Sequence, residues 1–264
     1  MTGIRLAVVT GATGGIGVAT CRALGREGYV VIAHYNSNHD GARELAKEMG
    51  RSGQACHLVS SDLSCDAGVD QVVGYVDELL ASYPSSSLGA LVNNAARLLG
   101  PGFFEATPAQ FDEYFSLNTK APFFLAQQLS TRMLAGGSVV NVSSASAHFS
   151  SPGDIVYAMT KAAIESLTRN MAEAVASRRI RVNTLVPGFT DNGHPAFQDR
   201  SVREYMSSFS VLGDVSTPEA VADAIIFLLS DQASRTTGSI LDVSGGSTLS
   251  ARGQRAGTVR DLLS

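Results

Sequence analysis

Short apolar runs alternate with longer amphipathic stretches along most of the chain. The short runs are rich in β-branched residues and nearly continuous in apolar residues, which is typical of strands buried on both faces of a parallel sheet. They predict strands at Leu6–Thr10, Val30–His34, Ala55–Ser60, Ala90–Asn93, Ser138–Val142, Ile180–Leu185 and Ile240–Val243. The amphipathic stretches predict helices at Ile16–Glu27, Asp40–Arg51, Ala67–Ser82, Pro108–Leu134, Ile155–Ser177 and Pro218–Leu229.

This alternation of strands and helices, joined by short links, predicts an α/β fold. We expect a single-domain doubly wound parallel sheet, Rossmann-like, with helices on both faces. The domain should span residues 1–249 and include a substrate-loop region at 188–215, which is longer than an ordinary link and is either a lid or a plain surface loop. Residues 250–264 form a polar C-terminal tail that is either disordered or docked on a neighbouring subunit.

Composition and charge narrow the classes of function. The chain has 264 residues, of which 44% are apolar and 17% charged, as in a globular protein with one sizeable core. Its net charge of -4 argues against a nucleic-acid partner. No apolar run approaches the ~18 residues of a membrane span, and no signal-peptide pattern opens the chain, so we expect a cytoplasmic protein. The scattered cysteines Cys21, Cys56 and Cys65 predict idle thiols rather than a disulfide frame or a metal site.

A glycine-rich turn follows the first predicted strand and opens a helix. Glycines let the backbone turn sharply and approach a ligand closely, and the helix N-terminus offers N–H groups to a pyrophosphate. A tight turn without a ligand is the alternative. A triphosphate P-loop is disfavoured because no Gly-Lys-Ser/Thr follows, and a serine hydrolase because the chain has no GxSxG elbow. The candidate cofactor-binding residues of this turn are Gly11, Thr13, Gly15, Ile16 and Gly17.

A tyrosine and a lysine supply candidate acid–base chemistry. Tyr157 and Lys161 are four residues apart on a predicted helix, so they share one face of it. A nearby ammonium lowers the pKa of a tyrosine, which can then exchange a proton near neutral pH. Ser144 lies just past a strand end, where ligands bind in an open parallel sheet, and its hydroxyl could polarise a substrate oxygen. Such pairs also occur on many exposed helices, so this interpretation depends on the combination.

In combination, these residues resemble the short-chain dehydrogenases/reductases, in particular the ketoacyl-reductase-like branch. The resemblance runs from about Arg5 to Gly246. It rests on Thr10-Gly11-Ala12-Thr13-Gly14-Gly15-Ile16-Gly17 (the TGxxxGxG of the family), Asp62-Leu63, Asn93-Asn94-Ala95-Ala96, Leu117-Asn118-Thr119, Ser143-Ser144, Tyr157-Ala158-Met159-Thr160-Lys161 (the YxxxK motif), Pro187-Gly188, Thr237-Gly238 and Gly245-Gly246, in the order of the family.

The resemblance implies an enzyme that moves a hydride between a nicotinamide cofactor and a ketone or secondary alcohol, without a metal. Tyr157 would be the general acid in reduction and the base in oxidation. Lys161 would hold the nicotinamide ribose and depress the tyrosine pKa. Ser144 would orient the substrate oxygen, and Asn118 would position a water that links Lys161 to solvent. The cofactor would further contact Tyr35, Asn36, Ser37, Asp62, Leu63, Asn94, Ala95, Ala96, Tyr157, Lys161, Pro187 and Gly188.

The end of the second strand bears on the choice between NADP and NAD. An aspartate there would bind both ribose hydroxyls and repel a 2′-phosphate. Tyr35 stands at this position instead, which favours NADP, with NADPH preferred and NAD possible. The arginines that many NADP-using relatives carry near residue 36 and at the position of Gly14 are absent. Residues 36–38 offer hydrogen bonds without charge, and His34 and His39 either add to them or are surface residues.

Apolar side chains around residues 188–215 predict a substrate pocket, although a core or interface role is equally open for them. They are Leu98, Leu99, Phe149, His194, Phe197, Tyr205, Met206 and Phe209. Such a lining suits an apolar, acyl or polyketide-like substrate. The alternatives are an inactive dinucleotide-binding sensor or scaffold, an NAD-dependent alcohol dehydrogenase of the same family, and a nucleotide-sugar epimerase or dehydratase. The resemblance implies a homotetramer or homodimer assembled through the helices predicted at Pro108–Leu134 and Ile155–Ser177.

Overall fold

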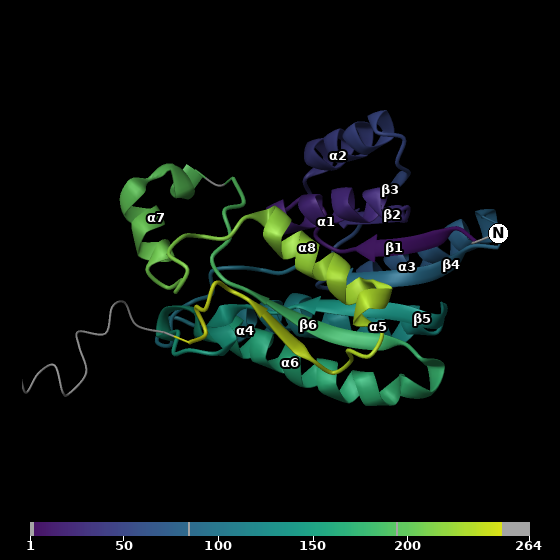
Figure 1. Cartoon of the computed structure of the whole chain (residues 1–264). Coiled ribbons are helices and arrows are strands. Elements are labelled where there is room, and N and C mark those ends of the chain that lie inside the picture. The colour runs from purple at the N-terminus through teal and green to yellow at the C-terminus, as the bar shows by residue number, and fades with distance from the viewer. Residues whose placement is uncertain (1–2, 84, 194, 250–264) are drawn as a thin grey trace, which may run out of the picture.

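The computed structural model describes residues 3–83, 85–193 and 195–249, so His194 and the predicted tail 250–264 lie outside the described residues. A parallel sheet runs through the middle of the molecule, and its strands lie in the order β3-β2-β1-β4-β5-β6-β7 (Figure 1). The strands are β1 (Arg5–Val9), β2 (Val30–Tyr35), β3 (Cys56–Ser60), β4 (Ser87–Asn93), β5 (Met133–Val142), β6 (Arg181–Pro187) and β7 (Ile240–Val243).

Helices cover both faces of this sheet. One face packs against α1 (Gly15–Arg26), α2 (His39–Arg51) and α8 (Pro218–Leu229). The other face packs against α3 (Asp66–Ser82), α5 (Ala121–Ser130) and α6 (Ile155–Ala174). The arrangement confirms the predicted Rossmann-like fold. Two further helices lie near the carboxyl ends of the strands, α4 (Pro108–Phe115) and α7 (Arg200–Ser207) (Figure 1).

The central strands are apolar on both sides because each side meets a helical layer. In β1, Leu6 and Val8 belong to the core with α3, α5 and α6, whereas Ala7 and Val9 belong to the core with α1, α2 and α8. All four side chains are fully buried. Burying a side chain of the size of leucine or valine stabilises a fold by about 1.5–3 kcal/mol. The unbroken apolar runs of the sequence are therefore the two-sided core of the sheet.

The strand order places a crevice between β1 and β4. After β1 the chain builds β2 and β3 on one side of it, and then crosses over to build β4 to β7 on the other side. Ligands of open α/β sheets bind at such a reversal of strand order, beyond the carboxyl ends of the strands. The glycine-rich turn leaves β1 at this place, and the segments with the other candidate residues leave the carboxyl ends of the neighbouring strands.

The helix predicted at Pro108–Leu134 is interrupted. It consists of α4, a π-helical turn at Ser116–Lys120 and α5, which ends at Ser130, and Met133 already belongs to β5. Within the π turn the Ala121 N–H donates to the Ser116 carbonyl, five residues earlier. Pro122 has no N–H to offer the carbonyl of the residue four positions before it, so the regular α-helical pattern cannot run through this point.

The region 188–215 also contains more regular structure than the sequence predicted. It includes a 3₁₀ turn at Pro195–Gln198 and the two-turn helix α7. The Asp199 carboxylate caps α7, accepting hydrogen bonds from the N–H groups of Ser201 (2.8 Å) and Val202 (3.3 Å). Val202, Tyr205 and Met206 also lie at helical spacing, so this cap together with the apolar period could have indicated the helix.

Other predictions concern membranes, thiols and metals. Within the described residues, none of the helices has the length and apolar character needed to cross a bilayer. Cys21, Cys56 and Cys65 are all free, and Cys21 is buried. The described part of the chain contains no cluster of three or more histidine, cysteine, aspartate or glutamate side chains arranged to hold a metal ion.

Candidate active site

The glycine-rich turn presents the start of α1 to the crevice. Gly11 has a φ of 64°, a left-handed conformation that favours glycine. A Cβ at Gly17 would lie 2.2 Å from the Gly11 carbonyl oxygen, so this close approach of backbone to backbone also requires glycine. Gly14, at the N-cap of α1, supplies no side-chain cap, and the first turn has no acidic residue. This helix N-terminus therefore fits a diphosphate group, with Thr13, Gly15 and Ile16 beside it.

Asn94, which directly follows β4, forms hydrogen bonds that hold the glycine-rich turn in place. Its Nδ2 donates to the carbonyl oxygens of Thr10 (2.9 Å) and Gly11 (3.1 Å). In return, the Thr10 hydroxyl accepts hydrogen bonds from the N–H groups of Asn94 and Ala95, both at 3.0 Å. Asn94 thus fixes the two sides of the crevice to each other, and the half-buried Ala95 and Ala96 follow it along the cofactor side.

His34 is part of the same support and not a surface residue. It is 2% exposed. Its Nδ1 accepts a hydrogen bond from the Gly11 N–H (3.4 Å) and its Nε2 donates to the Ser61 carbonyl (3.0 Å). Burial lowers the pKa of this imidazole, which suits the neutral ring that these two bonds require. Its place in β2 beneath the turn explains why a polar residue stands in an apolar strand.

The end of β2 carries no acidic side chain. Tyr35 is half-buried, and its hydroxyl is 3.2 Å from Nδ1 of the exposed His39. Asn36 and Ser37 are exposed, whereas Asn38 is engaged as the cap of α2 through a hydrogen bond from the Gly41 N–H. These residues leave room for hydrogen bonds to an adenosine ribose or its phosphate.

The remaining cofactor candidates lie at the ends of β3 and β6. Asp62 is exposed, and its hydrogen bonds with Ser64 lower the pKa of its carboxyl, while Leu63 is buried. Pro187 is buried at the end of β6. A Cβ at Gly188 would lie 2.6 Å from the Ser244 carbonyl oxygen, so the chain passes this point only with glycine. All of these positions lie along the carboxyl edge of the sheet.

Tyr157, Ser144 and Lys161 meet at the carboxyl end of β5. Tyr157 lies near the start of α6 and is 8% exposed, and Lys161 follows one turn later and is 3% exposed. The Lys161 ammonium donates a hydrogen bond to the Val142 carbonyl (2.8 Å) and lies 5.6 Å from the centre of the Tyr157 ring. Lys161 is thus anchored to the strand that leads to Ser144.

The electrostatics of this group differ from our expectation that Lys161 depresses the tyrosine pKa. Burial raises the pKa of the Tyr157 phenol to about 12; a hydrogen bond with the Ser144 hydroxyl lowers it, and the nearby Asp154 carboxylate raises it. Burial also lowers the pKa of Lys161 to about 8. In the protein alone, burial is therefore the main influence on the pKa of both groups. Tyr157 is held as a protonated acid near neutral pH.

Asn118 lies in the π turn and is 1% exposed. Its Oδ1 accepts a hydrogen bond from the Arg97 N–H (2.8 Å). Its Nδ2 donates to the Arg97 carbonyl and to the Thr160 hydroxyl, both at 3.1 Å. The side chain thus joins the segment after β4 to the residue just before Lys161. The role of Asn118 in positioning a water stays a prediction, because the hydrogen bonds of its side chain join it to Arg97 and Thr160.

The two adjacent serines have different partners. The buried Ser143 hydroxyl is 2.8 Å from Oε1 of Glu165 and 3.1 Å from the Lys161 carbonyl. The half-buried Ser144 hydroxyl bonds with Tyr157 and accepts a hydrogen bond from the Ser146 hydroxyl (3.0 Å). Ser144 is therefore the serine whose side chain contacts Tyr157, as the spacing predicted.

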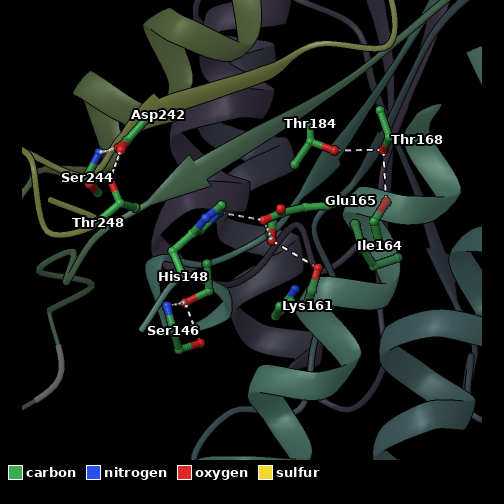
Figure 2. Close-up of polar contacts among 12 residues, drawn as sticks. Ser146, His148, Lys161, Ile164, Glu165, Thr168, Thr184, Asp242, Ser244 and Thr248 are labelled. Atoms are coloured by element: carbon green, nitrogen blue, oxygen red, sulfur yellow. Dashed lines mark hydrogen bonds and ion pairs between the residues drawn. The ribbon is translucent and has the colours of Figure 1, made fainter. Parts of the chain in front are cut away.

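Sequence reasoning missed Glu165 and His148. Glu165 lies one turn after Lys161 in α6 and is 7% exposed. Its Oε1 is 2.9 Å from Nε2 of His148, which belongs to the loop after Ser144 (Figure 2). An acid at this helical spacing resembles a solvated surface residue, and only the histidine in the adjoining loop could have suggested a buried partner.

An aromatic cluster borders this loop. The ring of Phe209 lies 5.7 Å from that of Phe149, 5.3 Å from that of Phe189 and 5.3 Å from that of Tyr205, measured between ring centres. Three of these four rings were predicted together from Phe149, Tyr205 and Phe209. Phe189 was missed because it directly follows the Pro187-Gly188 strand end.

The other residues of the predicted substrate pocket are not all in the cluster. Leu98 and Leu99 are 55% and 87% exposed on the segment after β4, and Phe197 is buried. Met206 is half-buried in α7. His194 lies outside the described residues. The rings around Phe209 are therefore the apolar surface that the structure places next to the loop that contains Ser144.

The segment after β6 is tied down at both ends of α7. Arg203 forms ion pairs with Asp191 (3.0 Å) and Asp214 (3.1 Å), which precede and follow the helix. Near its start, the segment packs over the glycine-rich turn, since a Cβ at Gly15 would lie 2.9 Å from Asn192. The substrate region thus contacts the cofactor region directly.

Comparisons with known proteins agree with this geometry. A family model described as Enoyl-(Acyl carrier protein) reductase matches residues 11–248. The chain belongs to the short-chain dehydrogenase/reductase family. An Escherichia coli relative, the uncharacterised oxidoreductase YgfF, is 34% identical over 256 residues, which cover 92% of this chain and 100% of YgfF.

Two solved structures of this short-chain dehydrogenase/reductase family are similar to the chain. The angucycline C-6 ketoreductase LanV with bound NADP is 38% identical, covers 93% of this chain and 96% of its own, and superposes with a TM-score of 0.89. LugOII, a promiscuous reductase that catalyses keto-reduction at C1 during lugdunomycin biosynthesis, is 35% identical, covers 94% and 99%, and has a TM-score of 0.90. The chain is thus an NAD(P)-dependent oxidoreductase, which confirms the predicted class of enzyme.

Proposed function

We propose that this short-chain dehydrogenase/reductase is an NADPH-dependent ketoreductase whose substrate is an apolar cyclic or polyketide-like ketone. The observation that carries the proposal is the position of Phe149. This ring lies in the same loop as Ser144 and packs against Phe209, so a surface of aromatic rings borders the group that would bind the carbonyl. The keto-reductions named for LanV and LugOII support the same substrate class.

The residues of the site divide the chemistry of reduction among them. When bound, the nicotinamide cofactor supplies the hydride. The Ser144 hydroxyl orients the carbonyl oxygen of the substrate, and the Tyr157 hydroxyl gives that oxygen its proton. Lys161 holds the cofactor ribose next to the tyrosine, and its positive charge favours the phenolate that remains after the proton has moved. In oxidation, Tyr157 takes the proton back from the alcohol.

The cofactor preference rests on the end of β2. Tyr35, Asn36 and Ser37 bring no carboxylate to the place where an acidic residue would repel a 2′-phosphate. The acidic residue nearest in sequence, Asp40, is paired with Arg43 at 2.5 Å. The NADP bound to LanV supports the same preference.

The first experiment measures cofactor binding and ketone reduction together. Cofactor fluorescence gives the Kd for NADPH and for NADH. The decrease in NADPH is then followed with 1-tetralone, cyclohexanone and pyruvate, which are an aromatic bicyclic, a simple cyclic and a small charged ketone. We expect tighter binding of NADPH and the highest kcat/KM with 1-tetralone. Tighter binding of NADH would overturn the cofactor choice, and a preference for pyruvate would overturn the substrate class.

A pair of variants tests the β2 end directly. Tyr35→Asp should weaken NADPH binding by about 10- to 100-fold, because a carboxylate there faces the 2′-phosphate, and should leave NADH binding unchanged or improved. Tyr35→Phe is the control, since it retains the ring and loses only the contact with His39. An equal loss of both cofactors in Tyr35→Asp would contradict the proposal.

We also propose that the chain assembles as a homotetramer or homodimer in the cytoplasm. Phe111, Phe123, Phe124 and Met159 expose 37–45% of their surface on α4, α5 and α6, the helices from which we expected assembly. The free cysteines suit a reducing compartment. Sedimentation that shows only monomer at micromolar concentration would contradict the assembly.

A further inference from the structure

Glu165 is a buried acid that the proposed chemistry does not use. Its side chain is 9% exposed, on the face of α6 that also carries Tyr157 and Lys161 at intervals of four residues. A carboxylate taken out of water destabilises a fold unless hydrogen bonds or an opposite charge compensate. A buried acid at this place therefore needs a structural reason.

The partners of Glu165 both come from one loop. Its Oε1 is 2.8 Å from the Ser143 hydroxyl, which donates to it, and 2.9 Å from Nε2 of His148. The His148 side chain is 30% exposed, and its ring points toward the Glu165 carboxylate, as Figure 2 shows. One oxygen atom of α6 thus holds both ends of the segment from Ser143 to His148.

This segment contains Ser144. The 3₁₀ turn Ala145–Ala147 lies between the two anchors, and the N–H and hydroxyl of Ser146 both bond with the Ser144 hydroxyl. The backbone of Ser143 is anchored to β6, because its N–H donates to the Leu185 carbonyl (2.8 Å). The far end of the turn has its side-chain anchor at His148. The two bonds to Glu165 thus hold a side chain at each end of the turn that carries Ser144.

We propose that Glu165 is a positioning residue, which through Ser143 and His148 holds Ser144 in the direction that binds the substrate carbonyl. The proposal concerns the proposed ketone reduction and rests on it. In this role Glu165 acts only through its hydrogen bonds with Ser143 and His148. A neutral side chain with an acceptor oxygen at the same reach performs the same task.

A double-mutant cycle between Glu165 and Ser144 tests the proposal. We expect Ser144→Ala to lower kcat for 1-tetralone by about 100-fold or more, and Glu165→Ala to lower it by about 10- to 100-fold, because a displacement of about 1 Å in a catalytic group has that effect. In the Ser144→Ala background, Glu165→Ala should change kcat less than about 3-fold, since the group it positions is gone. A full additional loss in that background would overturn the proposal.

Matched variants separate positioning from loss of folding. Glu165→Gln retains an acceptor oxygen and should keep kcat within about 3-fold of wild type, whereas Glu173→Ala removes an exposed acid from the same helix and should have no effect. NADPH affinity should stay within about 2-fold in every variant that folds. A loss in Glu165→Gln as large as that in Glu165→Ala would overturn the proposal.

Variants of His148 provide a second test, which does not require that Glu165→Ala folds. His148→Gln retains a donor for the carboxylate, and His148→Phe retains a ring without one. We expect His148→Phe to lower kcat about 10-fold with little change in KM for the ketone, and His148→Gln to stay near wild type. Equal activity of the two would overturn the role of this anchor.

A structural readout separates this proposal from the proposed function. If none of the ketones is reduced by wild type, the proposed function fails, and the positioning role is then decided by crystal structures of wild type and of Glu165→Ala or His148→Phe. We expect the Ser144 hydroxyl to move away from that of Tyr157 in the variant. A Ser144 hydroxyl left in place would overturn the proposal whatever the substrate is.

Discussion

The cofactor side of the site and its substrate side are held in place by different kinds of interaction. The glycine-rich turn after β1 is fixed by backbone groups, by the close approaches that require glycine at Gly11 and Gly17, and by the side chains of Asn94 and His34. The substrate side consists of the loop around Ser144 and the segment after β6. Backbone hydrogen bonds join Ser216 to Phe189 and Asp191 there. The substrate side also depends on ion pairs and hydrogen bonds between distant side chains, namely Glu165 to His148 and Arg203 to two aspartates.

The difference shows where this chain has freedom to vary. A turn made of backbone accepts any dinucleotide of the right shape, because its amides and helix end bind diphosphate and carry no information about the substrate. Side-chain anchors can be exchanged without disturbing the sheet, so they can tune which ketone is bound. Each prediction below changes one side and asks whether the other responds, from the largest expected effect to the smallest.

Tyr157→Phe should separate chemistry from binding most completely. Removal of the phenolic proton donor should lower kcat by about 100- to 10,000-fold, which is the usual contribution of a positioned general acid. NADPH affinity, measured by cofactor fluorescence, should change less than about 2-fold because the ring stays. Retention of more than a tenth of the wild-type kcat would show that another group gives the proton.

Gly17→Ala should damage the cofactor side. The added methyl would lie 2.2 Å from the Gly11 carbonyl oxygen, so the turn must open, with an expected loss of about 1–3 kcal/mol of unfolding free energy and a Kd for NADPH raised about 10-fold or more. Gly14→Ala is the control, because its methyl would meet only the same oxygen at 3.6 Å, an ordinary contact. Urea unfolding and fluorescence titration measure both. Equal effects of the two substitutions would contradict this account of the turn.

Lys161→Met should stabilise the protein without cofactor while removing activity. Burial lowers the pKa of Lys161 to about 8, so the unfolded chain binds more protons between pH 8 and about 10.4, and wild type gains stability as pH rises through this range. Below pH 8 the lysine is charged in both states, and the burial of this charge then lowers the stability of the wild-type protein by its full amount. After allowance for the lost bond to Val142, we expect the variant to be more stable by about 2 kcal/mol at pH 7.

This advantage of Lys161→Met should shrink as pH rises above 8 and disappear by about pH 10.5, where the lysine is neutral in the folded protein and about half neutral in the unfolded chain. The contribution of Tyr157 is common to the two proteins and cancels. Urea unfolding at pH 7 and pH 10 measures the difference. A difference in stability that does not depend on pH would show that lost packing, and not the buried charge, dominates.

Arg203→Ala should have the smallest effect and should act on the substrate side alone. Its ion pair with Asp214 is exposed and that with Asp191 is only half-buried, and pairs near the surface contribute little. We expect KM for 1-tetralone to rise about 2- to 5-fold, because α7 is held less firmly, with kcat and NADPH affinity unchanged. Added salt should raise KM of wild type toward that of the variant. A changed Kd for NADPH would show that α7 also serves the cofactor.

The sequence indicated the parts of this molecule that follow from local pattern. Two-sided apolar strands, the glycine-rich turn and the spacing of Tyr157 and Lys161 are features of neighbouring residues, and the structure confirms the fold and brings Ser144 to the tyrosine. The burial of Glu165 depends on contacts with a loop seventeen residues earlier, which no local period records. His34 was open to interpretation as a surface residue for the same reason.

Two further features could not be predicted from the sequence, because competing local effects determine them. The predicted helix over Pro108–Leu134 has a continuous helical pattern, and the interruption comes from the missing N–H of Pro122. The direction of the Tyr157 pKa was wrong because proximity to Lys161 is visible in the sequence, whereas the depth of burial is not. Desolvation becomes known only when the surroundings of a group are known.

The π-helical turn at Ser116–Lys120 also limits how this chain can change in length. A π turn takes up one residue more than an α turn and leaves the helices on its two sides in phase. A single insertion or deletion within α4 or α5 would instead rotate one half by about 100° against the other. Either Tyr114 would then lose the carbonyls of Leu98 and Leu99, or α5 would turn its buried leucines out of the core. Insertions and deletions should therefore be excluded from these two helices and accepted in the exposed loops.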